Sequence, residues 1–138
     1  MQAAPDTREA APPDADAIAR LVDRFYDKVT ADPVLGPVFN PVVHDWPEHK
    51  RLLTSFWCSV ALRAGSYRGN PMAAHRPLPV SAAHFEHWLA LWRATADEVL
   101  APAQAELMHD YARRIARSLR YGLGIDGPRP LGLPIAGG

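Results

Sequence analysis

The segment NPMAAHRPLP (residues 70–79) places one histidine, His75, among three prolines and shows no helical period of apolar residues. Proline removes a backbone donor and fixes its own φ, so a long helix does not run through these residues. The non-repeating stretch covers residues 65–80, which is longer than helix packing requires. We therefore expect a functional role for this segment and for its histidine.

On both sides of this segment, apolar residues recur at the period of an amphipathic helix. The first helical face carries Ile18, Leu21, Val22, Phe25 and Val29. Cap and stop residues delimit four predicted helices: one starting at Asp14 or Asp16 and broken by residues 32–43, one capped by Asp45 and ended by Gly65, one capped by Ser81 and stopped at Pro102, and one over residues 103–121.

The chain shows no strand alternation and no internal repeat, so the predicted class is all-α. Residues 14–121 form the expected single domain. Residues 1–13 and 122–138 are rich in Ala, Pro and Gly, and we expect both to be disordered tails.

Composition excludes several classes of protein. The 138 residues are 48% hydrophobic and carry 15 basic and 15 acidic side chains, so no nucleic-acid partner is expected. The single Cys58 rules out an internal disulfide framework and a thiolate-rich zinc site. No signal peptide and no run of roughly 18 apolar residues is visible, so we expect a cytoplasmic protein without a membrane span.

Sequence motifs for nucleotide binding and for a nucleophilic serine are absent, which leaves histidine as the chemistry-bearing residue. His84 and His87 have a spacing that can hold a metal, but no H-E-x-x-H motif accompanies them, and surface histidines at a helix start are the favoured interpretation. His44 and His109 are also interpreted as surface residues.

Three polar side chains lie on helix faces that should be buried. Tyr26 follows Ile18 and Val22 on the first helix, His49 heads the apolar stripe of the second, and Trp88 points inward from the third. Taken alone, each of these residues is most simply interpreted as a core residue whose polar group is hydrogen-bonded. Together with His75, they form the set that an iron cofactor with a diatomic ligand needs.

The stretches FYDKV, DPVLGPVFN, WPEHKRLLTSFW, GSYRGNPMAAH and HFEHWLALW, in this order and spacing, resemble those of the group III truncated haemoglobins. The resemblance covers roughly residues 18–121. It implies a shortened globin in which two helices pack over two others around haem b. The absence of C-x-x-C-H indicates that such a haem is held without covalent bonds.

On this resemblance, His75 corresponds to the proximal iron ligand and Tyr26 to the main donor to the bound gas. Trp88 corresponds to a supporting indole donor, His49 to the distal gate residue, and Phe39 to the aromatic residue packed on the haem.

The remaining candidate cofactor-binding residues are less specific. We expect apolar side chains to form core and haem wall, namely Leu53, Phe56, Phe85 and Trp92. Tyr67 and Arg76 flank His75 and are candidates for the haem propionates, although exposed surface residues of this kind are equally common.

The resemblance implies a protein that binds oxygen, carbon monoxide and nitric oxide reversibly at five-coordinate iron. Strong retention of oxygen leaves open an enzyme instead, a nitric oxide dioxygenase or a peroxidase with an unidentified reductase. A helical interaction module without a cofactor is the third alternative. We expect a monomer or a weak dimer.

Overall fold

The computed structural model describes residues 11–63, 65, 69–75 and 78–125, and it confirms the all-α class. These residues contain helices and no strand. The helices are α1 (Ala15–Ala31), α2 (Gly36–Phe39), α3 (Trp46–Leu62), α4 (Pro71–His75), α5 (Ala82–Val99) and α6 (Pro102–Gly122).

Helix α1 begins where its cap predicts. Asp14, rather than Asp16, is the cap, because its carboxylate accepts a hydrogen bond of 2.8 Å from the backbone N–H of Ala17. The predicted inner face is confirmed, since Ile18, Leu21, Val22, Phe25 and Val29 are all fully buried.

Helix α3 also begins as predicted, with the Asp45 carboxylate accepting from the backbone N–H of Glu48 at 3.0 Å. Its end differs from the prediction. The helix stops at Leu62, because Arg63 takes a left-handed conformation with φ of 55°, before the chain reaches Gly65.

Helix α5 is capped by Ser81 as predicted, and the imidazole of His84 completes a reciprocal capping box. The proline expected to stop this helix also starts the next one, since Pro102 is the first residue of α6.

Residues 32–43, predicted only as a break, contain the single-turn helix α2. The Asp32 carboxylate accepts from the backbone N–H groups of Val34 and Leu35, at 2.8 and 2.9 Å, which turns the chain into this helix.

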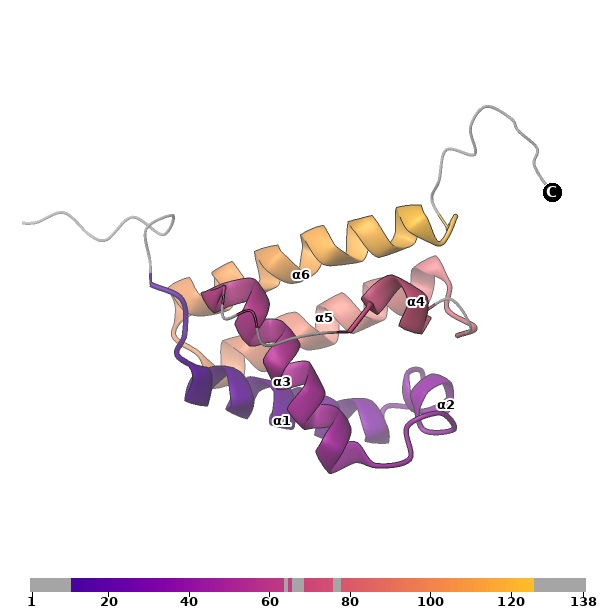
Figure 1. Ribbon diagram of the computed structural model, residues 1–138, viewed down its shortest axis with the longest axis horizontal. Coiled ribbons are helices and arrows are strands. Elements are labelled where there is room, and N and C mark those ends of the chain that lie inside the picture. Colours follow the sequence, from indigo (N-terminus) through magenta and orange to yellow (C-terminus); the bar gives the residue numbers. More distant parts are fainter. Residues whose placement is uncertain (1–10, 64, 66–68, 76–77, 126–138) are drawn as a thin grey trace, which may run out of the picture.

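Two helix pairs make up the fold (Figure 1). α1 packs on α3, α5 packs on α6, and α1 against α5 joins the pairs, consistent with a two-over-two arrangement. Lys50 on α3 reaches two carboxylates of α1, Asp23 at 2.8 Å and Asp27 at 2.6 Å. Helix α4 lies against α6 and carries His75.

Most residues of the two predicted tails lie outside the described chain. Among those described, Pro13 is fully buried, while Leu123 and Ile125 pack beside Phe85 and Leu119. These three residues are therefore packed with the helices of the described chain. No helix within it is long and apolar enough to cross a membrane.

Candidate functional site

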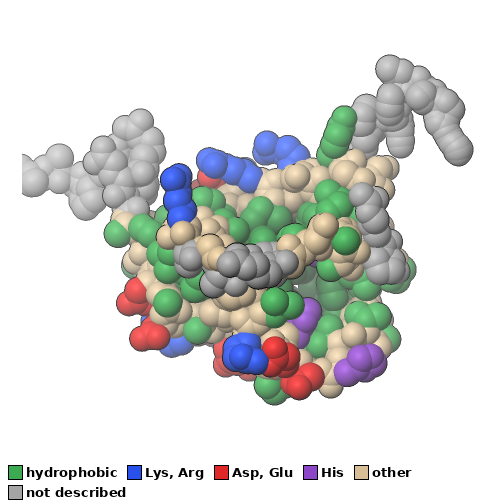
Figure 2. Space-filling view, viewed as in Figure 1, with side chains coloured by type: hydrophobic (Ala, Val, Ile, Leu, Met, Phe, Trp, Pro, Cys, Tyr) green, Lys and Arg blue, Asp and Glu red, His purple; other side chains and the backbone are tan. Residues whose placement is uncertain are grey.

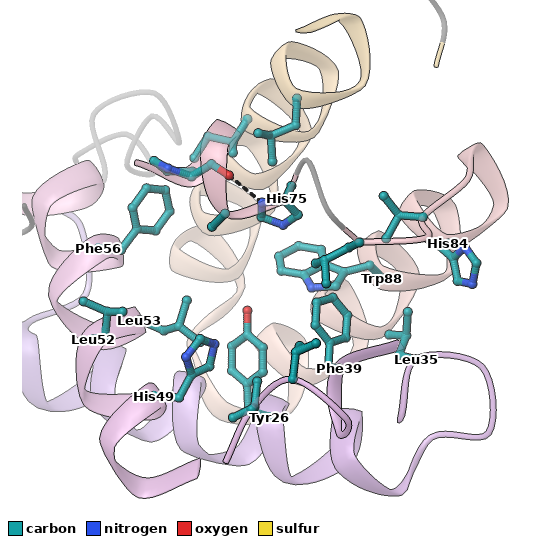
Figure 3. Close-up of a pocket in the computed structure, with 18 of the residues that line it drawn as sticks. Tyr26, Leu35, Phe39, His49, Leu52, Leu53, Phe56, His75, His84 and Trp88 are labelled. Atoms are coloured by element: carbon teal, nitrogen blue, oxygen red, sulfur yellow. Dashed lines mark hydrogen bonds between the residues drawn. The ribbon is translucent and has the colours of Figure 1, made fainter. Parts of the chain in front are cut away.

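A cavity of about 580 Å³ lies between α3, α4, α5, α6 and the turn around α2 (Figure 3). Figure 2 shows the same region as a hollow bordered by apolar and histidine side chains. Its walls are mainly apolar: Leu35, Phe39, Val42, Val43, Leu52, Leu53, Phe56, Trp57, Leu78, Val80, Phe85, Ala112, Ile115, Ala116 and Leu119.

The four polar residues singled out from the sequence come together in this cavity. His75 comes from α4, Tyr26 from α1, His49 from α3 and Trp88 from α5. In Figure 3 the hydroxyl of Tyr26 points into the cavity toward the side on which His75 lies. Residues 49 positions apart in the chain thus face each other across one apolar space.

The imidazole of His75 has a defined tautomer. Its Nδ1 lies 2.7 Å from the carbonyl oxygen of Pro71, one turn earlier in α4. A carbonyl oxygen only accepts, so Nδ1 carries a proton, and in the neutral imidazole Nε2 then carries the lone pair. Metal-bound histidines commonly donate their second N–H to a backbone carbonyl in this way. Nε2 is therefore prepared to bind a metal.

Tyr26 is a protonated donor at neutral pH. Its side chain is 6% exposed, and burial raises the pKa of the phenol well above its usual range, although a hydrogen bond with Trp88 opposes this shift. Phe25 packs edge-on against its ring, with centroids 4.6 Å apart. The hydroxyl therefore keeps its proton and a fixed position.

Trp88 is held by other aromatic rings. Its indole stacks on Trp92 with centroids 5.2 Å apart and an interplanar angle of 11°, and Phe25 meets it edge-on at 4.9 Å. These contacts define the direction of the indole N–H next to Tyr26.

His49 is half-buried at the cavity wall. Burial lowers the pKa of its imidazole, so the ring is mainly neutral at pH 7. Trp46 contacts it edge-on, with ring centroids 5.5 Å apart. A neutral imidazole can either donate or accept a proton at this position.

The other predicted cofactor-binding residues divide into three groups. Phe39, Leu53, Phe56 and Phe85 line the cavity. Trp92 does not; it is fully buried behind the wall, where its N–H donates to the carbonyl of Met108 at 3.2 Å and its ring stacks on Trp57. Tyr67 and Arg76 lie outside the described residues.

Two of the remaining histidines, His44 and His84, also line the cavity. His87 contacts Asp32 at 2.8 Å, whereas His84 caps its own helix, so the two do not converge on one metal. Within the described chain no group of three His, Cys, Asp or Glu residues can hold a metal ion. His44 is exposed as predicted, but His109 is half-buried next to Arg93, because α5 and α6 pack closely there.

Sequence analysis missed two parts of the wall. Trp46 lines the cavity beside Tyr26 and His49, and its position just after the Asp45 cap was the available signal. Helix α6 contributes Ala112, Ala116 and two larger residues to the opposite wall. Small residues on an apolar helix face look the same in sequence whether they border a core or a cavity.

Comparison with known proteins identifies the family of this chain. The family model described as bacterial-like globin matches residues 14–120. The group 3 truncated haemoglobin of Campylobacter jejuni is 34% identical over 106 residues, which cover 73% of this chain and 84% of that protein.

Solved structures show the same relationship. The crystal structure of the group III truncated haemoglobin from Campylobacter jejuni matches with a TM-score of 0.76 and 31% identity, over 83% of this chain and 94% of that one. A thermostable haemoglobin from Thermobifida fusca matches with a TM-score of 0.69 and 26% identity, over 86% and 95%. The chain therefore belongs to the bacterial-like globin family, as a truncated haemoglobin of group III.

Proposed function

We propose that this chain binds haem b in the cavity and holds a diatomic gas, oxygen foremost, between the iron and the hydroxyl of Tyr26. The observation that carries the proposal is the arrangement of His75. Its Nδ1 is committed to the Pro71 carbonyl, and its Nε2 is left to bind a metal on the side of the cavity opposite Tyr26.

The cavity suits a planar apolar group. Its volume of about 580 Å³ lies within the range of roughly 300–1,000 Å³ typical of cofactor sites. The aromatic walls supplied by Phe39, Phe56 and Phe85 suit a flat ring system, together with Leu53. The only cysteine, Cys58, is buried and is not part of the wall, which agrees with a haem held without thioether bonds.

When bound, haem would supply an iron atom able to bind one imidazole, for which His75 is the candidate, together with a diatomic gas. Tyr26 and Trp88 then serve as the hydrogen-bond donors to that gas, since both are fixed by ring packing and lie together. His49 serves as the residue at which a proton is held or passed, because its imidazole is neutral at pH 7 and borders the cavity.

Retention of oxygen follows from the two donors. Each charge-assisted hydrogen bond contributes about 1.5–3 kcal/mol. At about 1.4 kcal/mol per factor of ten, two such bonds slow oxygen release by roughly a hundredfold to ten-thousandfold. Retention of this size favours storage, sensing or consumption of oxygen over its bulk transport.

The absorbance spectrum of the purified protein tests the proposal. We expect a Soret band after expression with sufficient haem, a five-coordinate spectrum in the deoxygenated reduced protein, and reversible shifts with oxygen and carbon monoxide. Absence of a Soret band after titration with haemin would contradict haem binding. A six-coordinate spectrum of the reduced protein without added gas would place a second protein side chain on the iron and contradict an open gas site.

A further inference from the structure

Trp46 contacts two polar residues of the cavity wall, Tyr26 and His49. Its indole stacks on Tyr26 with ring centroids 6.0 Å apart and an interplanar angle of 30°, and it meets His49 edge-on at 5.5 Å. Trp46 is half-buried and lines the cavity. A change in the orientation of this one ring therefore affects both neighbours.

The indole N–H of Trp46 forms a hydrogen bond that connects this side chain to α1 through a second residue. Nε1 of Trp46 donates to the side-chain oxygen of Asn40 at 3.3 Å, and the amide nitrogen of Asn40 donates to the carbonyl oxygen of Thr30 at 3.0 Å. Thr30 belongs to the last turn of α1, the helix that carries Tyr26. Asn40 thus connects the indole of Trp46, which stacks on Tyr26, to α1, the helix that carries Tyr26.

Gly36 makes room for this connection. A Cβ atom at position 36 would lie 3.1 Å from both the amide nitrogen of Asn40 and the carbonyl oxygen of Thr30. Such contacts are tighter than ordinary van der Waals distances, so a side chain here would press on the hydrogen bond between these two residues. The absence of a side chain at Gly36 keeps that bond at its normal length.

We infer that Trp46 is a positioning residue that fixes the Tyr26 hydroxyl and the His49 imidazole relative to each other, and that Asn40 holds it in place. This inference rests on the proposed function. The N–H of Trp46 is committed to Asn40, which is exposed and does not line the cavity, so Trp46 acts through its neighbours and not as a donor to the gas.

Gas kinetics on a double-mutant cycle provide the first test. Trp46→Phe keeps an aromatic ring but removes the hydrogen bond to Asn40. We expect oxygen to be released about three- to tenfold faster, with little change in the release of carbon monoxide. In the Tyr26→Phe background, the same substitution should have almost no further effect, because its effect passes through the hydroxyl. Equal effects in both backgrounds would overturn the inference.

Asn40→Ala repeats the test without altering the cavity wall, and it should speed oxygen release in the same direction by a smaller factor. Phe85→Leu is the matched control, since Phe85 lines the cavity from α5. Loss of its ring should change both gases similarly. If Asn40→Ala released oxygen like the parent protein, the connection through Asn40 would be wrong.

The titration of His49, followed by NMR, gives a readout that does not depend on gas binding. Trp46→Phe uncovers part of the imidazole, so the pKa of His49 should rise toward its ordinary value, whereas Phe85→Leu should leave it unchanged. An unchanged pKa of His49 in Trp46→Phe would overturn the proposed effect of Trp46 on His49. Failure of the proposed function shows separately, as a missing Soret band.

Discussion

Asp32 and His87 are in hydrogen-bond contact across 55 positions of the chain, with Nε2 of His87 lying 2.8 Å from one carboxylate oxygen of Asp32 and 3.0 Å from the other. Asp32 ends α1 and turns the chain into α2, while His87 precedes Trp88 on α5. The contact therefore connects the part of the cavity wall that contains Leu35 to α5, the helix that carries Trp88, a proposed hydrogen-bond donor to the gas.

Asp32→Asn should weaken the fold most at neutral pH. Burial alone would raise the pKa of Asp32, but hydrogen bonds from His87 and from the N–H groups of Leu35 and Val34 outweigh it and hold the pKa below its usual value. A lowered folded pKa means that the stabilisation is present above the unfolded value of about 3.9 and is lost as pH falls through the folded value. We expect a loss of about 1–3 kcal/mol in urea unfolding at pH 7.

The pH dependence separates this effect from a general loss of packing. The difference in unfolding free energy between Asp32→Asn and the parent protein should shrink as the pH falls below about 4. The control is Asp16→Asn, because Asp16 is an exposed residue in the first turn of α1. This substitution should change the free energy of unfolding by only about a few tenths of a kcal/mol. A pH-independent loss in Asp32→Asn would contradict a role for the carboxylate charge.

His75→Gly should remove the only proposed protein bond to the iron. We expect most haem to be lost, or to be retained only when free imidazole is added to fill the space, as measured by the Soret band. His87→Ala is the control: His87 contacts Asp32 and does not line the cavity, so this variant should be less stable yet keep the parent spectrum. An unchanged spectrum in His75→Gly would rule out His75 as the ligand.

The four long helices could be predicted because their caps and apolar periods are local properties. Asp14, Asp45 and Ser81 all cap the helices expected of them. Helix α2 was missed because a single turn held by the Asp32 carboxylate leaves no periodic pattern.

The site was harder to predict because periodicity identifies a buried face without saying what that face is buried against. Trp92 and Trp88 are four residues apart on the same face of α5, yet only Trp88 borders the cavity. The packing of α6 determines which of the two borders the cavity, because α6 covers Trp92 and accepts its hydrogen bond at the carbonyl of Met108. Such a contact depends on tertiary packing and has no signature in the local sequence.

Trp92→Phe should therefore affect stability more than gas binding. The smaller ring leaves a void and removes the donor to the Met108 carbonyl, so we expect a loss of about 1–3 kcal/mol in chemical unfolding. Oxygen release should change by less than about threefold, because a positional shift passed on through Trp88 is worth only a few tenths of a kcal/mol. Loss of the Soret band with unaltered stability would instead make Trp92 a direct haem contact.

Tyr26→Phe decides whether the buried hydroxyl acts on the gas or only completes the core. The substitution keeps the ring and its contact with Phe25, so packing should change little. Loss of one charge-assisted hydrogen bond should speed oxygen release by about ten- to a hundredfold. Carbon monoxide carries much less negative charge on its outer atom, so its release should change far less.

Stopped-flow release of both gases from Tyr26→Phe and Trp88→Phe separates a lost hydrogen bond from a loosened pocket. Trp88→Phe should act in the same direction on oxygen but should also lower stability, because its indole is stacked on Trp92 and a smaller ring leaves space there. If oxygen release in Tyr26→Phe stayed within about twofold of the parent, or if both gases accelerated equally, the hydroxyl would be structural. A large change for oxygen alone requires a donor that points at the gas, and the proposed donor is the buried, protonated phenol of Tyr26, whose hydroxyl points into the cavity.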